Sequence, residues 1–509
     1  MRQTSVAFRR ALADDKRDYI TKMRIYLASG GAIGGNSAIT GFISLNVTPG
    51  ATEYKITKFD IDGFRSRIVI AFGDLEERDY VFVMDGSNKW VLTDAQDVVA
   101  TNCGISGSGD ASQGDTLTVR IVKSSLIWFG SPKIEDAVSN DNDLEVGGVI
   151  VNKATLVLNN IYDDFKEFDF YDSIVALYVG LDDLSRYSDP SHWSITEYLL
   201  MGTYLTSEVD YDGSTVTLTC LDNMSKFDKP YVYDNPPSSG VIYDIILTLC
   251  ARCGVTGPPL PSSVPNGNFV VTNIPSTDAN LTYRQVLSWL AQIAGCFARC
   301  DNKGRLVFSW YDMSFLTPTA SNELDGGHFD DSTPYASGDS ADGGTFNPWN
   351  TGDVFDDGNF SSNRTFHVIP GAYSQWVDRE DIEVSGVIVI YKVDSGSSSE
   401  NVSILSGTDD KYVIVIKDND MITPDIAQSL ADYLGGRFIG MKFRRAQIAH
   451  PSDPSIEAGD VAYYTDFRGN AYRLIVSSTI FSIYDSQNTT SSAQSTRSNS
   501  ATLDSIISD

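Results

Sequence analysis

The sequence predicts a mainly β protein of several domains, with α+β parts. Its 509 residues exceed what one hydrophobic core usually serves, so about three to five domains are expected. Tyr (25) and Phe (24) are frequent, and short runs of Thr, Val and Ile favour strands over helices. Hydrophobic residues make up 42% and charged residues 21%, which is an ordinary globular balance.

The first quarter of the chain predicts a β module inserted into another domain. A helix over 5–20 and a strand over 22–30 lead into the glycine-rich "GGAIGGNS". Short strand-like runs at regular spacing then favour a small sandwich over 31–122. The host domain comprises 1–30 plus 123–235. The strand-like runs of the module are 38–47, 53–61, 65–73, 78–86 and 116–123.

The host domain continues with "KATLVLNN" (153–160) and "SIVALYVGL" (173–181), both strands by their alternating pattern. A hairpin over 197–231 follows, with its turn at "DYDGS" (210–214). These segments predict an antiparallel, barrel-like sheet.

A helical and mixed α+β domain is expected at 236–320. One helix spans 241–254 and ends at a glycine, which is a natural C-terminal stop. Another spans 281–300, where Thr282 and Gln285 have the spacing of a capping box.

Three further segments complete the expected organisation. Residues 321–379 form a Gly/Asp-rich turn region, which repeats acid, glycine and Phe at 325–329, 342–346 and 356–360. A second β domain covers 380–485 and includes a helix over 423–440, with Pro at its first position. The Ser/Thr-rich end, 486–509, is expected to be a flexible tail.

The stretch "IYDDFKEFDFYD" (161–172) raises the question of a catalytic or metal site. A carboxylate pair in catalysis needs a cleft, and a hard metal needs several oxygens converging on one point. A solvated connection between strands, with Phe165, Phe168 and Phe170 packed inward, needs neither and is preferred. A salt-bridge or subunit-contact role comes next, and metal or catalysis last. The five acids are Asp163, Asp164, Glu167, Asp169 and Asp172.

Four cysteines pose a similar question. Cys250 and Cys253 form C-x2-C, and Cys296 and Cys300 form C-x3-C. Such pairs could hold zinc or form a disulfide. Because the first pair lies on the apolar side of an expected helix, core packing is preferred, with zinc left open.

The sequence indicates no catalytic apparatus and no cofactor, so we expect a protein that is not an enzyme. His192, His328, His367 and His450 share no metal-hydrolase spacing, and no Walker or G-x-S-x-G stretch stands between a strand and a helix. The Asp/Gly turns resemble calcium loops only loosely. We therefore expect no catalytic, cofactor-binding or metal-binding residues.

The net charge of −29 excludes wrapping of DNA and docking on an anionic membrane, since each requires a basic face. An acidic wall can still line a path for DNA, because like charge keeps the polyanion from adhering. No run of 18 apolar residues and no apolar signal core occur, so a soluble product made in the cytoplasm is expected.

Several stretches resemble the tail-tip or baseplate-hub proteins of phages and prophages of Gram-positive bacteria, the N-terminal hub modules of tail-associated lysins. The resemblance covers most of 1–30 and 124–485. It rests on the three Asp/Gly/Phe turns and on "KIEDAVS" (133–139), "VIVNKATLVLNNIYDDFKEFDFYDS" (149–173), "VTLTCLDNMSKFDKPY" (216–231), "LTYRQVLSWLAQIAGCFARCDNKGRLVFSWYD" (281–312) and "IEAGDVAYYTDFRGNAYRLIVSSTIF" (456–481).

This resemblance implies a structural virion protein at the distal end of the tail. It implies a homotrimer whose two tube-like β-barrel domains per chain form a ring on the hexameric tail tube. The implied partners are the tail tube protein, the distal tail protein, and tail fibre or receptor-binding proteins. DNA passes through the lumen without specific binding, so the ring takes part in DNA ejection.

Two departures from the family pattern qualify these expectations. The module at 31–122 is additional, and it could bind a glycan of the host surface in an adsorption role. Trp90, Tyr80 and Phe82 are candidate aromatics for that role, although core packing is the more common use of such residues. Many family members continue into a coiled coil, a peptidoglycan hydrolase or a receptor-binding region, whereas this sequence stops at Asp509, so we expect that lytic activity does not carry over.

Overall fold

The computed structural model describes most of the chain from residue 132 onward and selected segments before it. The described ranges are 132–140, 144–159, 169–182, 199–317, 366–369, 371–394, 399–482 and 486–493, with Arg2, Leu12, 18–26 and the strands β2 to β7. This part of the protein is mainly β-sheet with few helices. None of its helices has the length and apolarity needed to span a membrane.

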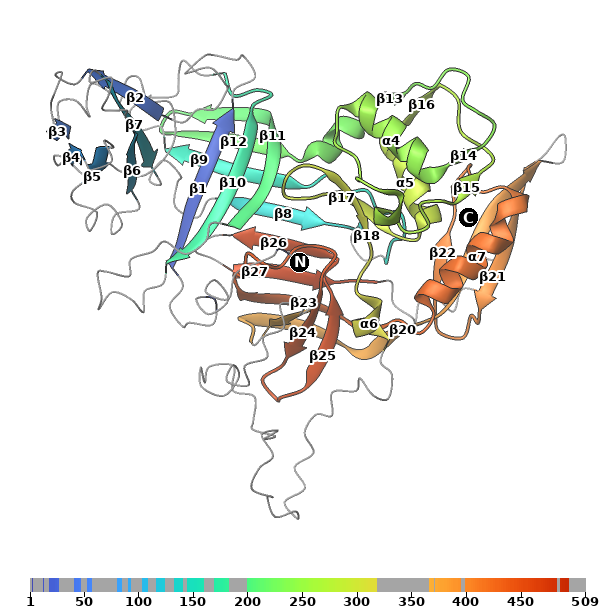
Figure 1. The fold of residues 1–509 in the computed structure, drawn as a ribbon. Helices are drawn as coiled ribbons and strands as arrows, with labels where there is room; N and C mark the ends of the chain where they lie inside the picture. Colours follow the sequence, from blue (N-terminus) through green and yellow to red (C-terminus); the bar gives the residue numbers. More distant parts are fainter. Residues whose placement is uncertain are drawn as a thin grey trace, which may run out of the picture.

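One twelve-stranded sheet, made from segments far apart in the sequence, organises the molecule (Figure 1). We call its first six strands the first half: β1 (Asp18–Tyr26), β10 (Ile174–Asp182), β11 (Leu199–Asp212), β12 (Thr215–Leu221), β9 (Lys153–Asn159) and β8 (Lys133–Ala137). The second half continues with β26 (Ser478–Ser482), β27 (Ser486–Ser491), β23 (Lys442–Pro451) and the start of β20 (Ser374–Asp394). The halves join where β8 pairs antiparallel with β26.

The first half is built on apolar alternation, as the sequence predicts. On β9, Ala154, Leu156 and Leu158 are fully buried, and on the neighbouring β12 so are Val216 and Leu218. Because successive side chains of a strand point to opposite faces, this spacing places all of them on one face. They belong to a single cluster that also includes Phe170.

The predicted helices of the middle region are confirmed as α4 (Ile242–Cys253) and α5 (Tyr283–Ala294). The predicted capping box is present, because the Gln285 N–H donates to Thr282 Oγ1 at 3.2 Å and the Thr282 N–H donates to Gln285 Oε1 at 2.8 Å. The chain leaves α5 at Gly295 with φ 66° and enters the hairpin of β17 (Phe297–Cys300) and β18 (Leu306–Ser309). The predicted helix over 281–300 is therefore too long at its end.

Short elements complete this helical layer. They are the 3-10 turns η3 (Asn223–Phe227) and η4 (Pro261–Ser263), the helix α6 (Met313–Leu316), and two small ladders, β13 (Pro230–Tyr231) with β16 (Asp278–Thr282) and β14 (Gly240–Val241) with β15 (Val270–Val271).

The region expected at 380–485 is divided between two cores. Beyond Glu383, β20 pairs with β21 (Ser399–Gly407) and β22 (Tyr412–Ile416), and α7 (Pro424–Phe438) packs on this unit. The apolar face of α7 joins the core of the helical layer, where the rings of Phe438 and Trp310 lie 4.8 Å apart. A separate core holds β19 (His367–Ile369), β24 (Val461–Thr465) and β25 (Ala471–Ile475).

The inserted segment contains two three-stranded antiparallel sheets. One has the order β2 (Gly41–Asn46), β7 (Thr116–Lys123), β6 (Cys103–Ser108), and the other β3 (Glu53–Ile56), β4 (Tyr80–Met84), β5 (Trp90–Leu92). Four of the five predicted strands coincide with one of these, and the run at 65–73 lies outside the described residues.

Three boundaries differ from the sequence-based expectation. Residues 486–491, assigned to the flexible tail, form β27 between β23 and β26. Strands β19 and β20 begin inside the expected turn region 321–379. The strand expected at 22–30 already begins at Asp18, inside the segment expected to be helical. Among the described residues no ladder joins β1 to β8, so closure into barrels and the division into domains stay predictions.

Candidate functional site at the junction of the two halves

A buried ion network lies where the two halves of the sheet meet the helical layer. Asp136 stands on β8, Arg299 on β17, and Glu457 in the turn before β24. Arg299 Nη2 lies 3.2 Å from Asp136 Oδ2 and 3.2 Å from Glu457 Oε2. Arg299 is 8% exposed and Asp136 5%, so both charges are almost entirely removed from water. One guanidinium thus connects three parts of the fold.

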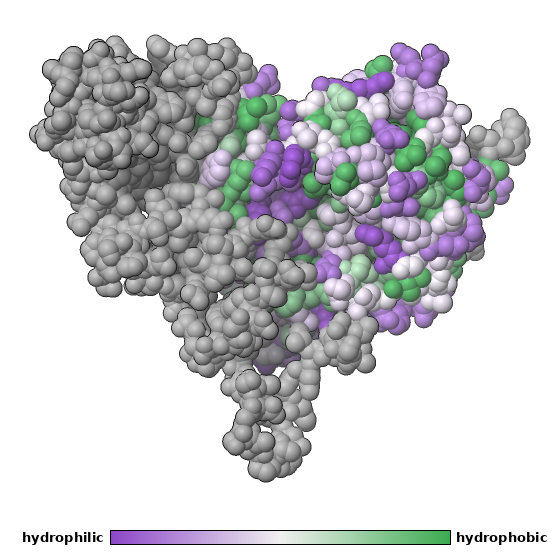
Figure 2. Space-filling model, viewed as in Figure 1, coloured by the Kyte–Doolittle hydropathy of each residue, from purple (hydrophilic) through white to green (hydrophobic). Residues whose placement is uncertain are grey.

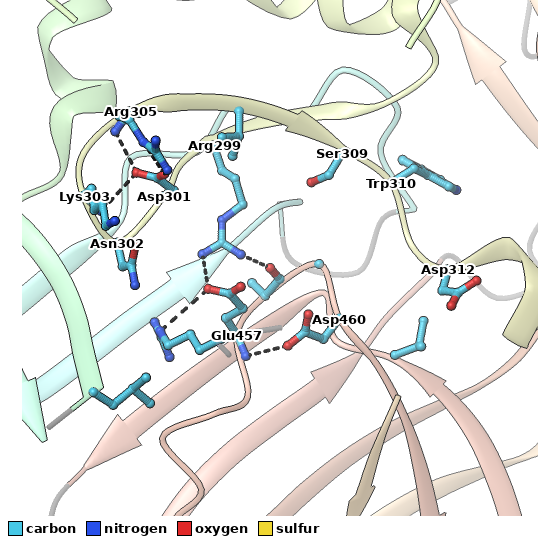
Figure 3. Close-up of a pocket in the computed structure, with 16 residues that line it drawn as sticks. Arg299, Asp301, Asn302, Lys303, Arg305, Ser309, Trp310, Asp312, Glu457 and Asp460 are labelled. Carbon is cyan, nitrogen blue, oxygen red and sulfur yellow. Dashed lines mark hydrogen bonds and ion pairs between the residues drawn. The ribbon is translucent and has the colours of Figure 1, made fainter. Parts of the chain in front are cut away.

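Backbone groups bind further polar atoms of this ion pair, while Arg299 Nε is buried without a hydrogen-bond partner. Arg299 Nη1 donates to the Ala458 carbonyl, and the Ala458 N–H donates to Asp136 Oδ2 at 3.0 Å. Figure 3 shows the Arg299 side chain reaching from β17 toward Glu457, with Asp460 beside it. A buried charge is tolerated only where partners of this kind replace its hydration.

Arg2 adds a second guanidinium from the start of the chain. Its Nη1 donates to the Pro454 and Ile456 carbonyls at 3.0 and 3.2 Å, and its Nη2 donates to the Met201 carbonyl at 3.0 Å. Its Nε lies 3.7 Å from Glu457 Oε2. Since Met201 is on β11, Arg2 ties the first half to the turn that carries Glu457.

The conformation of the turn Glu457–Asp460 places the Glu457 carboxylate within the ion network. Asp460 Oδ2 accepts the Glu457 N–H at 3.0 Å and lies 2.9 Å from His367 Nε2. Gly459 has φ +95°, and a Cβ at this position would lie 2.7 Å from the Phe297 ring. Only glycine combines this backbone conformation with this close approach.

Burial and ion pairing shift the pKa values of these carboxyl groups in opposite directions. Burial opposes ionisation of Glu457, but the charges of Arg299 and Arg2 outweigh it and hold its pKa below the usual range. Burial also opposes ionisation of Asp460, but the hydrogen bond from His367 and other favourable charge interactions together outweigh it and lower the pKa of Asp460. For Asp136 burial dominates and raises the pKa, with Arg299 opposing it. Asp136 and Glu457 together raise the pKa of Arg299 despite its burial.

A cavity of about 580 Å³ opens beside the network. Its rim includes the β17–β18 turn, where Arg305 Nε donates to Asp301 Oδ2 at 2.8 Å and Lys303 lies nearby. This turn docks on the first half, because Asn302 Nδ2 donates to the Leu200 carbonyl at 3.2 Å. In Figure 2 strongly hydrophilic side chains gather over this turn.

The network is suited to holding the parts of the fold together. Each of its carboxylates is engaged by a guanidinium, an imidazole or a backbone N–H, and none stands beside a hydroxyl or thiol nucleophile within the network. No group of three or more His, Cys, Asp or Glu among the described residues is placed to hold a metal ion.

The acid-rich stretch 161–172 is described only from Asp169 onward. Asp169 and Asp172 are exposed, while Phe170 between them is fully buried, as the preferred interpretation requires. Asp169 Oδ1 accepts the Tyr171 N–H at 3.1 Å, and Asp172 adopts φ 55° in a turn. Asp163, Asp164, Phe165, Glu167 and Phe168 lie outside the described residues, as do the three Asp/Gly/Phe turns.

The four cysteines of the predicted pairs are free and buried in one core, which confirms the packing interpretation and contradicts a disulfide. Burial raises the pKa of Cys250 to about 12 and of Cys253 to about 11, and it also raises those of Cys296 and Cys300. Among the described residues these thiols do not form a group placed to hold a metal ion. Tyr80, Phe82 and Trp90 lie on β4 and β5, and their side chains are outside the described set.

Sequence reasoning did not single out Asp136, Arg299, Glu457 or Asp460 as a site. A signal was nevertheless present, because each lies in a stretch that carries the family resemblance: "KIEDAVS", "CFARC" and "IEAGD". A lone arginine between apolar residues of a strand, as in "FARC", indicates a buried charge that needs a distant partner.

Comparisons with known proteins gave structural likenesses only. No family model and no curated protein matches the sequence. The 43 kDa tail protein of prophage MuSo2 from Shewanella oneidensis aligns over 77% of this chain and 97% of its own, with 12% identity and a TM-score of 0.38. Prophage tail protein gp18 from Listeria monocytogenes aligns over 77% and 96%, with 12% identity and a TM-score of 0.37.

The tail protein from Neisseria meningitidis MC58 aligns over 71% of this chain and 90% of its own, with 10% identity and a TM-score of 0.39. TM-scores of this size do not by themselves establish a shared fold. These three solved structures are described as tail proteins, and the similarity of this chain to each of them is distant.

Proposed function

We propose that this chain is a structural, non-enzymatic protein of a bacteriophage tail, located in the tail tip or baseplate hub. The observation that carries the proposal is the continuous sheet, which joins distant segments of the chain and is fixed at its junction by the Asp136–Arg299–Glu457 network. A protein built on one continuous sheet is suited to carry mechanical load and to present surfaces to neighbouring proteins of the tail. The sequence stretches that resemble phage hubs support the same assignment.

In its finer form the proposal is a homotrimeric ring at the distal end of the virion tail. Three chains with two β-barrel domains each present six related surfaces to a hexameric tail tube, which solves a symmetry mismatch by quasi-equivalent contacts. Tail tube and distal tail proteins adjoin the ring, and fibres or receptor-binding proteins attach further out. The charge of −29 suits the wall of a DNA exit channel.

Reconstitution with tail tube protein tests the proposal. The purified chain is mixed with the tube protein of the same phage, and the products are measured by negative-stain imaging and by mass. We expect rings of three chains seated on tube ends. Particles whose tails contain no copy of this chain, or a chain that never binds tube protein, would contradict the proposal.

A second candidate is adsorption to a host-surface glycan through the inserted module. Among the described strands, neither of its two three-stranded sheets pairs with the twelve-stranded sheet, which favours a separate role. Deletion of 31–122 should then leave assembly intact and reduce adsorption to host cells. Loss of assembly in this deletion would assign the module a scaffold role instead.

A further inference from the structure

The cavity beside the ion network has the size of a ligand-binding site. Its volume is about 580 Å³, and sites for small ligands usually measure about 300 to 1,000 Å³. The hairpin of β17 and β18 lines one side of it, and the turn before β24 lines the other. In Figure 3 Arg299 and Ser309 extend from the hairpin, and Glu457 and Asp460 lie across from them. The chemistry of these two sides decides what the cavity can hold.

The carboxylates in the lining already have partners in the protein. Glu457 and Asp460 belong to the ion network, where they bind guanidinium and imidazole groups. Asp301 Oδ2 accepts from Arg305 Nε at 2.8 Å, and Asp312 Oδ1 accepts a backbone N–H of α6 at 2.9 Å. A cationic ligand would have to displace bonds of this kind, so a cation fits the cavity poorly.

Several donors in the same lining have no acceptor. Arg299 Nε is buried without a hydrogen-bond partner. Within the described part of the chain, the Ser309 hydroxyl and the Lys303 ammonium form no hydrogen bond or ion pair. A buried donor without an acceptor lowers stability, and a ligand that brings acceptor oxygens removes this deficit. A carboxylate is such a ligand, and its charge complements the cationic donors.

The register of the hairpin places these donors on one face. Arg299 lies opposite Val307, and Ser309 and Arg305 are two residues from Val307 on either side. Because alternate residues of a strand point to the same face, these side chains share one side of the hairpin, and all four line the cavity. An anionic head group beside the Ser309 hydroxyl therefore lies in the positive potential of the neighbouring guanidinium groups.

The rest of the lining sets the size and charge of the ligand. Leu199, Val307 and Val461 give the cavity an apolar part next to the donors. The lining contains as many carboxylates as cationic side chains, so a ligand with several negative charges, such as a polyphosphate or a nucleic acid, would be repelled. A ligand with one carboxylate and an apolar body matches both features.

We propose that this cavity binds a single carboxylate carried on an apolar body, through the Ser309 hydroxyl and the Lys303 ammonium, with Arg299 supplying positive potential. Two sources share this chemistry. One is a free aliphatic acid, and the other is an acidic side chain between apolar residues on a neighbouring protein. The inference stands independently of the proposed tail function.

Isothermal titration calorimetry of the full-length chain at neutral pH tests the site. One arm compares hexanoate with hexanamide, and the other compares the peptide acetyl-Leu-Glu-Leu-amide with its Gln counterpart. The carboxylate of each pair should bind about 10-fold more tightly than the amide, or better, because it makes charge-assisted hydrogen bonds. Tighter binding of hexanoate than of the Glu peptide assigns the free acid, and the reverse order assigns the protein segment.

Substitutions in the hairpin locate the ligand. Ser309→Ala should weaken carboxylate binding about 5- to 30-fold, and Lys303→Met should remove the preference for carboxylate over amide. Val307→Phe keeps every donor but fills the space between them, so it should abolish binding. Lys392→Met is the matched control, because Lys392 is also exposed and lies outside the lining.

A crystal structure with hexanoate gives an independent readout and should place a carboxylate oxygen about 3 Å from Ser309 Oγ. Equal affinity for carboxylate and amide, unchanged affinity in Ser309→Ala and Lys303→Met, or binding that survives Val307→Phe would each overturn the proposed site. Absence of binding by either carboxylate probe at about 10 mM would do the same. Unchanged thermal melting shows that the variants are folded. Because none of these measurements involves tail proteins, the site and the tail assignment stand or fail separately.

Discussion

The two halves of the sheet are buried by different chemistry. The first half places Leu156, Leu158 and Leu218 in its core with no exposed surface. The second half buries polar side chains at equivalent depth, with Gln487 at 0% and Thr489 at 1% exposure. Both halves belong to one continuous sheet, so the difference does not arise from the backbone.

Specific partners satisfy the polar interior of the second half. Gln487 Nε2 donates to Thr479 Oγ1 at 2.9 Å, and its Oε1 accepts the Asp453 N–H at 2.7 Å. His450 Nε2 lies 2.8 Å from Thr489 Oγ1. The free energy gained by burying an apolar side chain is roughly proportional to the area buried. A buried polar group, in contrast, requires a specific hydrogen-bond partner at a defined position. The second half therefore gains specificity of pairing and is more sensitive to loss of a single atom.

The junction between the halves should give the largest effect. Arg299→Ala leaves Asp136 and Glu457 buried without their shared cation, so we expect a loss of about 3–5 kcal/mol in unfolding free energy. Urea unfolding of the full chain measures it. Arg305→Ala is the control, because its pair with Asp301 is half exposed and should contribute less than about 1 kcal/mol. Equal effects of the two variants would contradict the structural role of the junction.

Within the first half, a cavity in the apolar core should lower the unfolding free energy more than the loss of one hydrogen bond does in the second half. Leu156→Ala removes a fully buried side chain from the centre of β9 and should destabilise by about 2–5 kcal/mol. Chemical denaturation with the slope compared to wild type gives the value. A loss below about 1 kcal/mol would mean that the first half can collapse around the gap, and the contrast between the halves would weaken.

Within the second half, Thr489→Val tests whether the polar interior matters. The substitution keeps the shape and removes the hydroxyl beside His450 Nε2, so we expect a loss of about 1–3 kcal/mol. Thr217→Val on β12 is the matched control in the first half, where the side chain is half-buried and the change should stay within about 0.5 kcal/mol. A neutral or stabilising Thr489→Val would break the comparison.

The response to pH should differ in sign between the halves. Asp222, at the end of β12, has a pKa raised by burial to about 7, and its Oδ2 has no hydrogen-bond partner. The unfolded value is about 3.9, so the folded state holds a proton that the unfolded state has lost between these values, and stability falls as pH rises from about 4 to 7. The lowered pKa values of Glu457 and Asp460 act oppositely, since their contribution is lost as pH falls below about 4.

Asp222→Asn isolates the first of these effects. The amide keeps an oxygen for the Met224 N–H, which donates to Asp222 Oδ1 at 3.0 Å, and it carries no charge. We expect the variant to match wild type near pH 4 and to exceed it at pH 8 by about 4 kcal/mol, which corresponds to a pKa difference of about three units. Melting curves across this range provide the comparison, and a difference that does not change with pH would refute the assignment.

The sequence predicted the parts of the fold that depend on periodicity and on local caps. The alternation of "KATLVLNN" identified β9, and the Thr282–Gln285 spacing located the start of α5. It failed at "SQNTTS", which reads as a polar tail and forms β27. Gln487 and Thr489 are buried because they form hydrogen bonds with Thr479, Asp453 and His450, and these partners lie in other elements and turns of the fold.

By itself, then, the sequence determined the mainly β class, the two helices of the middle region and the apolar core of the first half, because neighbours in the chain encode them. The tertiary structure alone decided that β8 pairs with β26, that Arg299 meets Asp136 and Glu457, and that β27 is interior. These contacts join residues more than a hundred positions apart or polar groups with single partners. Burial of a charge or an amide is favourable only when that partner is in place, and only the assembled fold puts it there.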